Sequence, residues 1–196
     1  MLRLFRLSSF TVLNRKSILS ITLLAAILTA GNVWAQARKT SISCTSDSDG
    51  NVTVSFRISG VGNGNLCVVS SGTYTANCAC ENGGGNCPSA DNKQSSSEPV
   101  SNGQSFASTN GQISGSETLT APNESSCTLT CPGGQTPILA ELIEPSPISV
   151  EVFGPGTFST SGGNCSPNLG ANPVRTGSCT PRPQSIIFNK NCATLF

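Results

Sequence analysis

Apolar and polar residues alternate along much of the chain beyond residue 40, and a period of two is typical of β-strands that bury one face. The clearest stretch is residues 52–58, where the alternating positions are Val52, Val54, Phe56 and Ile58 against Thr53, Ser55 and Arg57. Residues 40–46 have the same period, and Asp49-Gly50 between the two stretches is a turn signal. The sequence therefore predicts an antiparallel hairpin over residues 40–59.

Several later stretches also predict strands. LCVVSSGTYTANCAC (66–80) indicates one broken strand or two, and strands resume at Phe106. The turn signal Asn110-Gly111 precedes a stretch in which alternate residues share one face, namely Ile113, Gly115, Glu117 and Leu119. Residues 127–131 and 148–153 predict two more strands.

Two segments are less regular. ILAELIE (138–144) fits either a strand or a repeated helical turn, and its brevity together with Pro137 and Pro145 favours a strand. Residues 81–104 are rich in Gly, Ser and Asn, so we expect a long loop there. Residues 159–196 contain SIIF as their one apolar run, and we expect a loop-rich tail that is packed on the preceding domain.

Short strands separated by turns about every ten residues predict an all-β fold, an antiparallel β-sandwich with a small barrel as the alternative. Only 11% of the residues are charged, whereas Gly and the small polar residues are abundant, which favours strands and turns over helices.

The N-terminus has the pattern of a secretory signal peptide. Four basic residues precede the apolar run ILSITLLAAILTA (18–30), and small residues follow at positions suited to cleavage after Ala35 or Ala37. An uncleaved membrane anchor is the alternative, because residues 17–37 carry no charge. We assign residues 1–35 to the signal peptide, residues 38–158 to the β-domain and residues 159–196 to the tail.

Removal of this leader leaves seven basic and ten acidic residues, a net charge of −3. The basic residues are scattered singly, so the chain lacks the basic patch that nucleic-acid binding requires. Once the signal is cleaved we expect no membrane association. The predicted location is secreted or periplasmic, and the expected partner is an extracellular or periplasmic protein or surface ligand.

All ten cysteines lie in the exported part of the chain: Cys44, Cys67, Cys78, Cys80, Cys87, Cys127, Cys131, Cys165, Cys179 and Cys192. An even number in an oxidising compartment predicts structural disulfides. The chain has no His, and its close cysteine spacings are not those of zinc sites, so we expect no metal ligand and no activated thiol.

Strand geometry restricts the pairing of these cysteines. Cys78 and Cys80 are two residues apart in a predicted strand, so they share a face and need separate partners. Cys127 and Cys131 are roughly 13 Å apart if their segment is extended, beyond the ~7 Å limit for a disulfide. The flexible ENGGGN segment (81–86) predicts that Cys87 returns to Cys80 or Cys78.

Two groups of residues suggest chemistry. Glu141, Glu144 and Glu151 would supply the paired carboxylates of a sugar hydrolase, but their positions also suit the solvent side of strands. DSDGN (47–51) has alternating oxygen ligands, yet it lacks the later glycine and glutamate of a calcium loop, and a hairpin turn explains it. We therefore predict no catalytic residue and no cofactor.

Asn51 and Asn123 begin glycosylation sequons.

CENGGGN (Cys80 to Asn86) has the form Cys-x-Asn-x-Gly-Gly-Asn, and NGQISGSETLTAP and CPGGQTPILAELI follow it. These motifs resemble a group of small secreted bacterial and fungal proteins of unassigned role. The resemblance implies a secreted all-β module and transfers no catalytic residue.

These observations favour a non-enzymatic binding or surface-interaction module. The alternatives are a secreted toxin or inhibitor acting through the loop 81–104, and a hydrolase that uses the three glutamates.

Overall fold

The structure is a computed structural model that describes residues 39–88, 92–145, 147–182 and 185–196. The predicted signal peptide and both of its candidate cleavage sites lie outside these residues. Within them, no helix is long and apolar enough to cross a membrane.

Three strands form the smaller sheet, in the order β1-β2-β5. The predicted hairpin is confirmed, because β1 (Thr40–Ser46) pairs antiparallel with β2 (Val52–Ser59). Asp47 closes the turn by accepting hydrogen bonds of 2.9 Å from the backbone N–H groups of Asp49 and Asn51. The other edge of β2 pairs with β5 (Gln112–Leu119).

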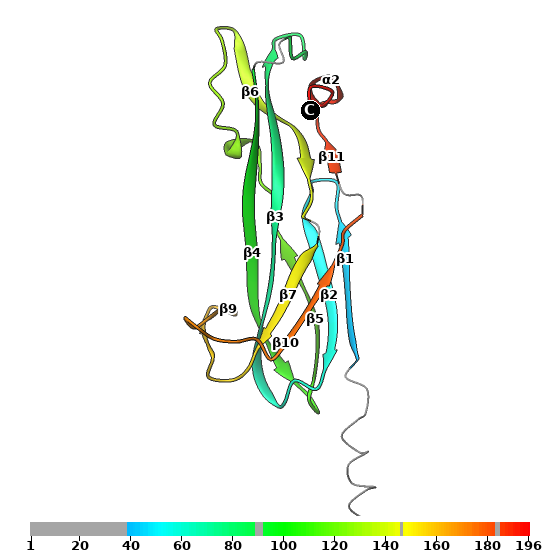
Figure 1. Ribbon diagram of the computed structural model, residues 1–196, viewed down its shortest axis with the longest axis vertical. Coiled ribbons are helices and arrows are strands. Elements are labelled where there is room, and N and C mark those ends of the chain that lie inside the picture. The colour runs from blue at the N-terminus through cyan, green and yellow to red at the C-terminus, as the bar shows by residue number, and fades with distance from the viewer. Residues whose placement is uncertain (1–38, 89–91, 146, 183–184) are drawn as a thin grey trace, which may run out of the picture. The chain divides into compact units, whose positions relative to one another are not determined.

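The larger sheet is built around β3 (Gly64–Asn82), which is one strand of 19 residues rather than two. One edge of β3 pairs with β4 (Lys93–Ser108). The other edge pairs with β7 (Ile148–Phe153) and then with β6 (Gln135–Ile143), so these two strands follow one another along β3 (Figure 1). The predicted strand over residues 138–144 is thereby confirmed.

The two sheets are antiparallel and stay open, so the predicted sandwich is confirmed and the barrel alternative is wrong. Apolar side chains of both sheets meet in one core. The predicted face of β2 is completely buried, with Val52 and Val54 at 0% exposure and Phe56 at 4%.

All ten cysteines are paired, which confirms the predicted disulfide framework: Cys44–Cys179, Cys67–Cys165, Cys78–Cys127, Cys80–Cys131 and Cys87–Cys192. Cys78 and Cys80 do have separate partners. The predicted return of Cys87 to either of them is wrong. Cys78 faces the core between the sheets, whereas Cys87 and Cys192 pack beside Ala79 on the opposite face of β3.

The long loop expected over residues 81–104 is also wrong, since β3 extends to Asn82 and β4 begins at Lys93, so the second half of this range is strand. Several half-buried side chains of β4 are polar, such as Ser96 and Asn102, whereas Val100 and Phe106 pack against the core. Asn102 Nδ2 donates a hydrogen bond of 2.9 Å to the carbonyl oxygen of Thr118 in β5. Pro99 is tolerated because the outer edge of β4 pairs with β9 at one position, Gln104 with Asn164.

The strand predicted over residues 127–131 is wrong too. This segment follows the short 3-10 helix η1 (Glu124–Ser126) and runs without strand pairing. Its two cysteines fasten it to β3 instead.

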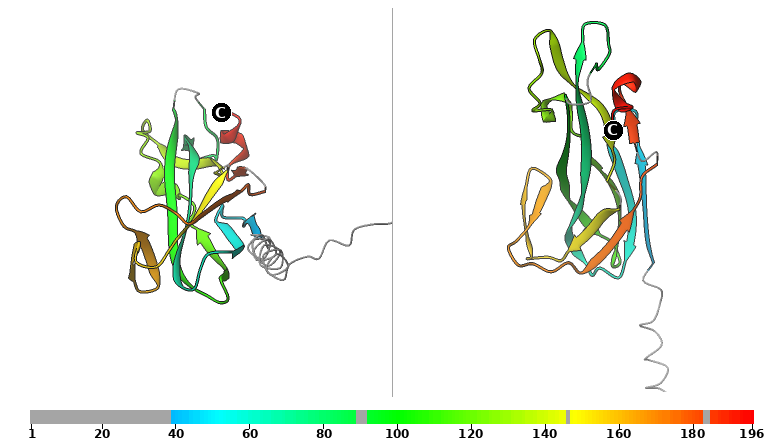
Figure 2. Two further views of the ribbon diagram at one scale, coloured as in Figure 1. Left: turned by 60° about the horizontal axis from the view of Figure 1, so that its bottom comes forward. Right: turned by 45° about the horizontal axis from the view of Figure 1, so that its top comes forward.

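Residues 159–196 contain more regular structure than the expected loop-rich tail. The elements that fall at least partly within this region are β8 (Phe158–Ser161), β9 (Asn164–Pro167), β10 (Arg175–Cys179), β11 (Ser185–Ile187) and the helix α2 (Lys190–Ala193). β10 extends the larger sheet beside β7, and β11 extends it beside β6. The β8–β9 hairpin and α2 lie near opposite ends of this sheet (Figure 2).

Candidate functional site

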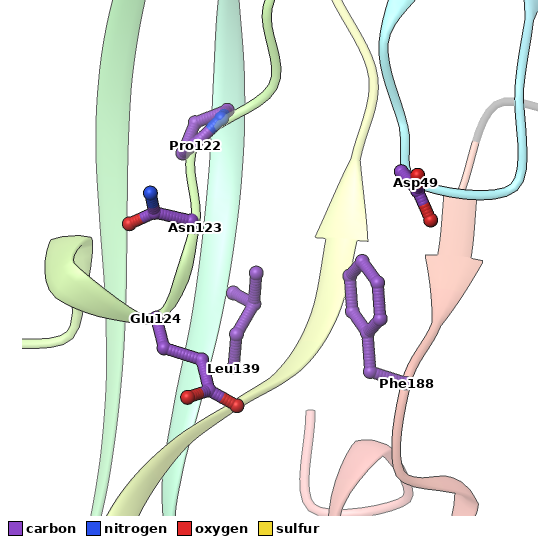
Figure 3. A pocket seen from close by; sticks show the side chains of 6 residues that line it. All are labelled: Asp49, Pro122, Asn123, Glu124, Leu139 and Phe188. Carbon is purple, nitrogen blue, oxygen red and sulfur yellow. The ribbon is translucent and has the colours of Figure 1, made fainter.

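A cavity of about 250 Å³ lies beside the β1–β2 turn. We call it the turn cavity, and it is lined by Asp49, Pro122, Asn123, Glu124, Leu139 and Phe188 (Figure 3). The lining comes from four segments that are distant in the sequence: the hairpin turn, the segment after β5, strand β6 and the residue after β11. No local sequence motif contains more than three of these residues.

Hydrogen bonds from backbone and side-chain groups, together with a disulfide, fix the walls of the turn cavity. Asn51 Oδ1 accepts a 3.1 Å hydrogen bond from the Ala121 N–H, which joins the hairpin turn to the segment after β5. Asn123 caps η1 by accepting hydrogen bonds from Ser125, and the disulfide of Cys127 follows directly. The N–H of Phe188 donates a 2.9 Å hydrogen bond to the Ala140 carbonyl of β6. The cavity is therefore formed in advance of any ligand.

The chemistry of the turn cavity combines acidic and apolar groups. Asp49 and Glu124 supply two exposed carboxylates, while Leu139 is 5% exposed and forms an apolar wall. The Phe188 side chain is 47% exposed and lies across the cavity from Leu139 (Figure 3). Such a site suits a ligand with a positive charge and an apolar body.

A second cavity lies between the edges of β4 and β5 and is lined by Pro99, Val100, Ser101, Asn102, Thr118 and Thr120. Its volume is about 540 Å³, but its lining contains no titratable side chain. It therefore offers hydrogen bonds and no charge.

The three glutamates considered for hydrolysis are not brought together. Glu141 pairs with Asn77 of β3 and Glu151 pairs with Val69, eight residues away along the same strand. That separation is about 26 Å, whereas the carboxylates of glycosidases lie within roughly 10 Å of each other. Glu141 instead accepts a 2.9 Å hydrogen bond from Asn77 Nδ2. This geometry does not support the proposed hydrolase.

Glu144 is buried beneath the hairpin and is 3% exposed. Ser46 Oγ donates a 2.6 Å hydrogen bond to its Oε2 atom. Burial raises the pKa of Glu144, although the hydrogen bond from Ser46 acts in the opposite direction. Nearby, Tyr74 donates a 2.8 Å hydrogen bond to the carbonyl oxygen of Gly50, and burial followed by the charge of Glu144 raises the Tyr74 pKa. Through these hydrogen bonds, Glu144 and Tyr74 hold the β1–β2 turn in place.

Glu117 is a second buried acid, and the sequence predicted only its place in a strand. Glu117 of β5 is 2% exposed and accepts a hydrogen bond from Ser70 Oγ of β3, across the interior of the sandwich. Burial raises the pKa of Glu117 to about 7, against the lowering effect of the hydrogen bond from Ser70. Its position on the inward face of β5 was predicted by the alternation of residues 113–119.

The remaining motifs have structural roles. DSDGN forms the predicted hairpin turn, and Gly50 adopts a φ of 85° there. Within the described ranges, no group of three or more His, Cys, Asp or Glu side chains is placed to hold a metal ion. The toxin or inhibitor hypothesis relied on a loop at residues 81–104, and strand β4 occupies the second half of that range.

No family model matches the chain, and no curated protein matches it. Among solved structures, the chain is similar to a bacterial adhesin from Mobiluncus mulieris that contains intramolecular disulfide, isopeptide and ester bond cross-links. The TM-score is 0.41 at 11% identity, and the match covers 75% of this chain and 55% of that chain. This is a distant structural similarity, and the chain spans little more than half of that adhesin's length.

Proposed function

We propose that the protein is an exported, non-enzymatic binding module and that the turn cavity contacts its partner. The observation that carries this proposal is the construction of the cavity. Four distant segments meet there, and hydrogen bonds and a disulfide hold them in place. A rigid site binds without the entropic cost of ordering its own loops.

The disulfides support the location of this activity outside the cytoplasm. All ten cysteines are paired, and such a framework persists in oxidising compartments and is rare in the cytosol. The predicted signal peptide agrees with export to a periplasm or to the cell exterior.

The test is whether the exported protein is retained on the surface of the cells that produce it. We expect the wild type to be retained and the triple variant Asp49→Asn/Glu124→Gln/Phe188→Ala to be released into the medium. These three side chains are exposed, so the variant should fold, which an unchanged thermal midpoint would verify.

Thr73→Ala is the matched control, because Thr73 is an exposed residue of β3 outside the cavity lining. Its retention should equal that of the wild type. If the wild type is not retained, or if the triple variant is retained equally well, the proposal is wrong.

A further inference from the structure

We infer that the turn cavity binds an alkylammonium group, the chemistry presented by a lysine side chain of a partner polypeptide. This inference rests on the proposed function, since it names the ligand class of the same cavity. It follows from the charge, the apolar surface and the volume of the site.

The charge of the cavity is negative on two of its sides. Figure 3 shows Asp49 on one side and Glu124 on the other, with Leu139 and Phe188 between them. No basic side chain is part of the lining. Within the described residues, neither carboxylate takes part in a hydrogen bond or an ion pair of the fold, so both are available to a ligand. An anion would be repelled, whereas a cation would be attracted from either side.

The apolar part of the cavity indicates that the bound cation has an apolar stem. Leu139 and Pro122 offer surface to methylene groups, and a lysine side chain is a flexible apolar stem that ends in a compact charge. The exposed ring of Phe188 adds an aromatic surface that can make a cation–π contact with the ammonium group. A small inorganic cation would leave this apolar surface uncovered.

The volume of the cavity limits the size of the ligand. Pockets for drug-sized ligands occupy roughly 300–1,000 Å³, and the turn cavity, at about 250 Å³, is smaller than that range. It therefore suits one side chain of a partner better than a whole small molecule.

The experiment is a titration of the full exported protein with Nα-acetyl-lysine methylamide, followed by the backbone amide NMR signals of Asp49, Glu124 and Phe188. We expect saturable shifts at these three signals. The Nε-acetylated analogue, which keeps the stem but lacks the charge, should produce none. Added salt should weaken binding, because exposed charges are screened.

Variants assign the charge to particular residues. Asp49→Asn or Glu124→Gln should each weaken lysine methylamide binding about 2- to 5-fold, which corresponds to the worth of an exposed ion pair. Glu151→Gln removes a carboxylate on β7 outside the cavity and should leave the affinity unchanged. The inference is overturned if the neutral analogue binds as tightly, or if the double variant Asp49→Asn/Glu124→Gln keeps wild-type affinity.

A parallel titration with n-pentylamine distinguishes the sources of the ammonium group. Binding of both probes supports a lysine residue. If pentylamine alone binds, the cavity takes an ammonium group, but the inference that a lysine residue supplies it is wrong. Cell-surface retention that requires the cavity, without binding of either amine, would overturn this inference and leave the proposed function standing.

Discussion

Glu117 places a carboxyl group between the two sheets, where the surrounding side chains are apolar. Its pKa of about 7 exceeds the value of about 4.3 expected in the unfolded chain, so the folded state holds the proton more tightly. Stability is therefore unaffected below about pH 4.3, falls as the pH rises from about 4.3 to 7, and levels off above that. The loss is on the order of 3 kcal/mol when complete.

Glu117→Gln removes this titration and keeps an oxygen that can accept from Ser70. We expect the variant to be more stable than the wild type at pH 8 and to gain little or nothing at pH 4.5, by urea unfolding with the disulfides intact. Glu151→Gln, which changes a carboxylate outside this core, should follow the wild type at both values. An equal effect of Glu117→Gln at both pH values would show that the burial of this acid does not govern the pH dependence.

At the scale of single elements, an aromatic contact helps to hold β4 against the smaller sheet. The Phe106 ring lies against Gly115 of β5 and meets the Phe56 ring edge to face, with centroids 5.0 Å apart. A Cβ at position 115 would overlap the Phe106 ring. The glycine is therefore required for this close approach.

Gly115→Ala should consequently destabilise the protein. Alanine gains about 0.5–1 kcal/mol over glycine in the backbone, but forcing the Phe106 ring to move costs about 1–3 kcal/mol. The expected net loss is about 1–2 kcal/mol in urea unfolding. Gly133→Ala is the control, because nothing lies within 4 Å of its Cβ position and it should be neutral or slightly stabilising. A Gly115→Ala variant as stable as the wild type would contradict the contact.

A comparison of β4 with β2 and β5 explains why some strands could be predicted from the sequence and β4 could not. β2 and β5 bury alternate residues in the core between the sheets, and both strands were predicted from that alternation. β4 has the same backbone period, but several of its half-buried residues, such as Ser96 and Asn102, are polar. The apolar period is therefore interrupted, and the strand resembles a loop.

The turn cavity was not predictable for a different reason. Asp49 was interpreted as a turn residue, Glu124 as part of a glycosylation sequon and Phe188 as the end of an apolar run. Each interpretation is compatible with the local structure. The site arises because tertiary contacts bring these residues together, and that proximity leaves no trace in residue spacing.

For the whole molecule, one disulfide differs from the other four. Cys44–Cys179 joins β1 of the smaller sheet to β10 of the larger sheet, where Gly177 also lies against Ile42. None of the other bridges involves a strand of the smaller sheet. In a barrel, continuous strand pairing would connect β1 to β10. This sandwich is open, and the disulfide connects the two strands instead.

Removing this bridge should therefore have a different local effect from removing Cys67–Cys165, which attaches the β8–β9 hairpin. The two bridges have sequence separations of 135 and 98 residues, so loop entropy differs by only about 0.3 kcal/mol between them. We expect each double Cys→Ser variant to lose about 2–5 kcal/mol. Hydrogen exchange separates them: it should rise in β1 and β10 without Cys44–Cys179, and in β8 and β9 without Cys67–Cys165. If both variants instead raised exchange evenly across the two sheets, the bridges would act only by restricting the unfolded chain, and the sheets would be held together by their apolar core alone.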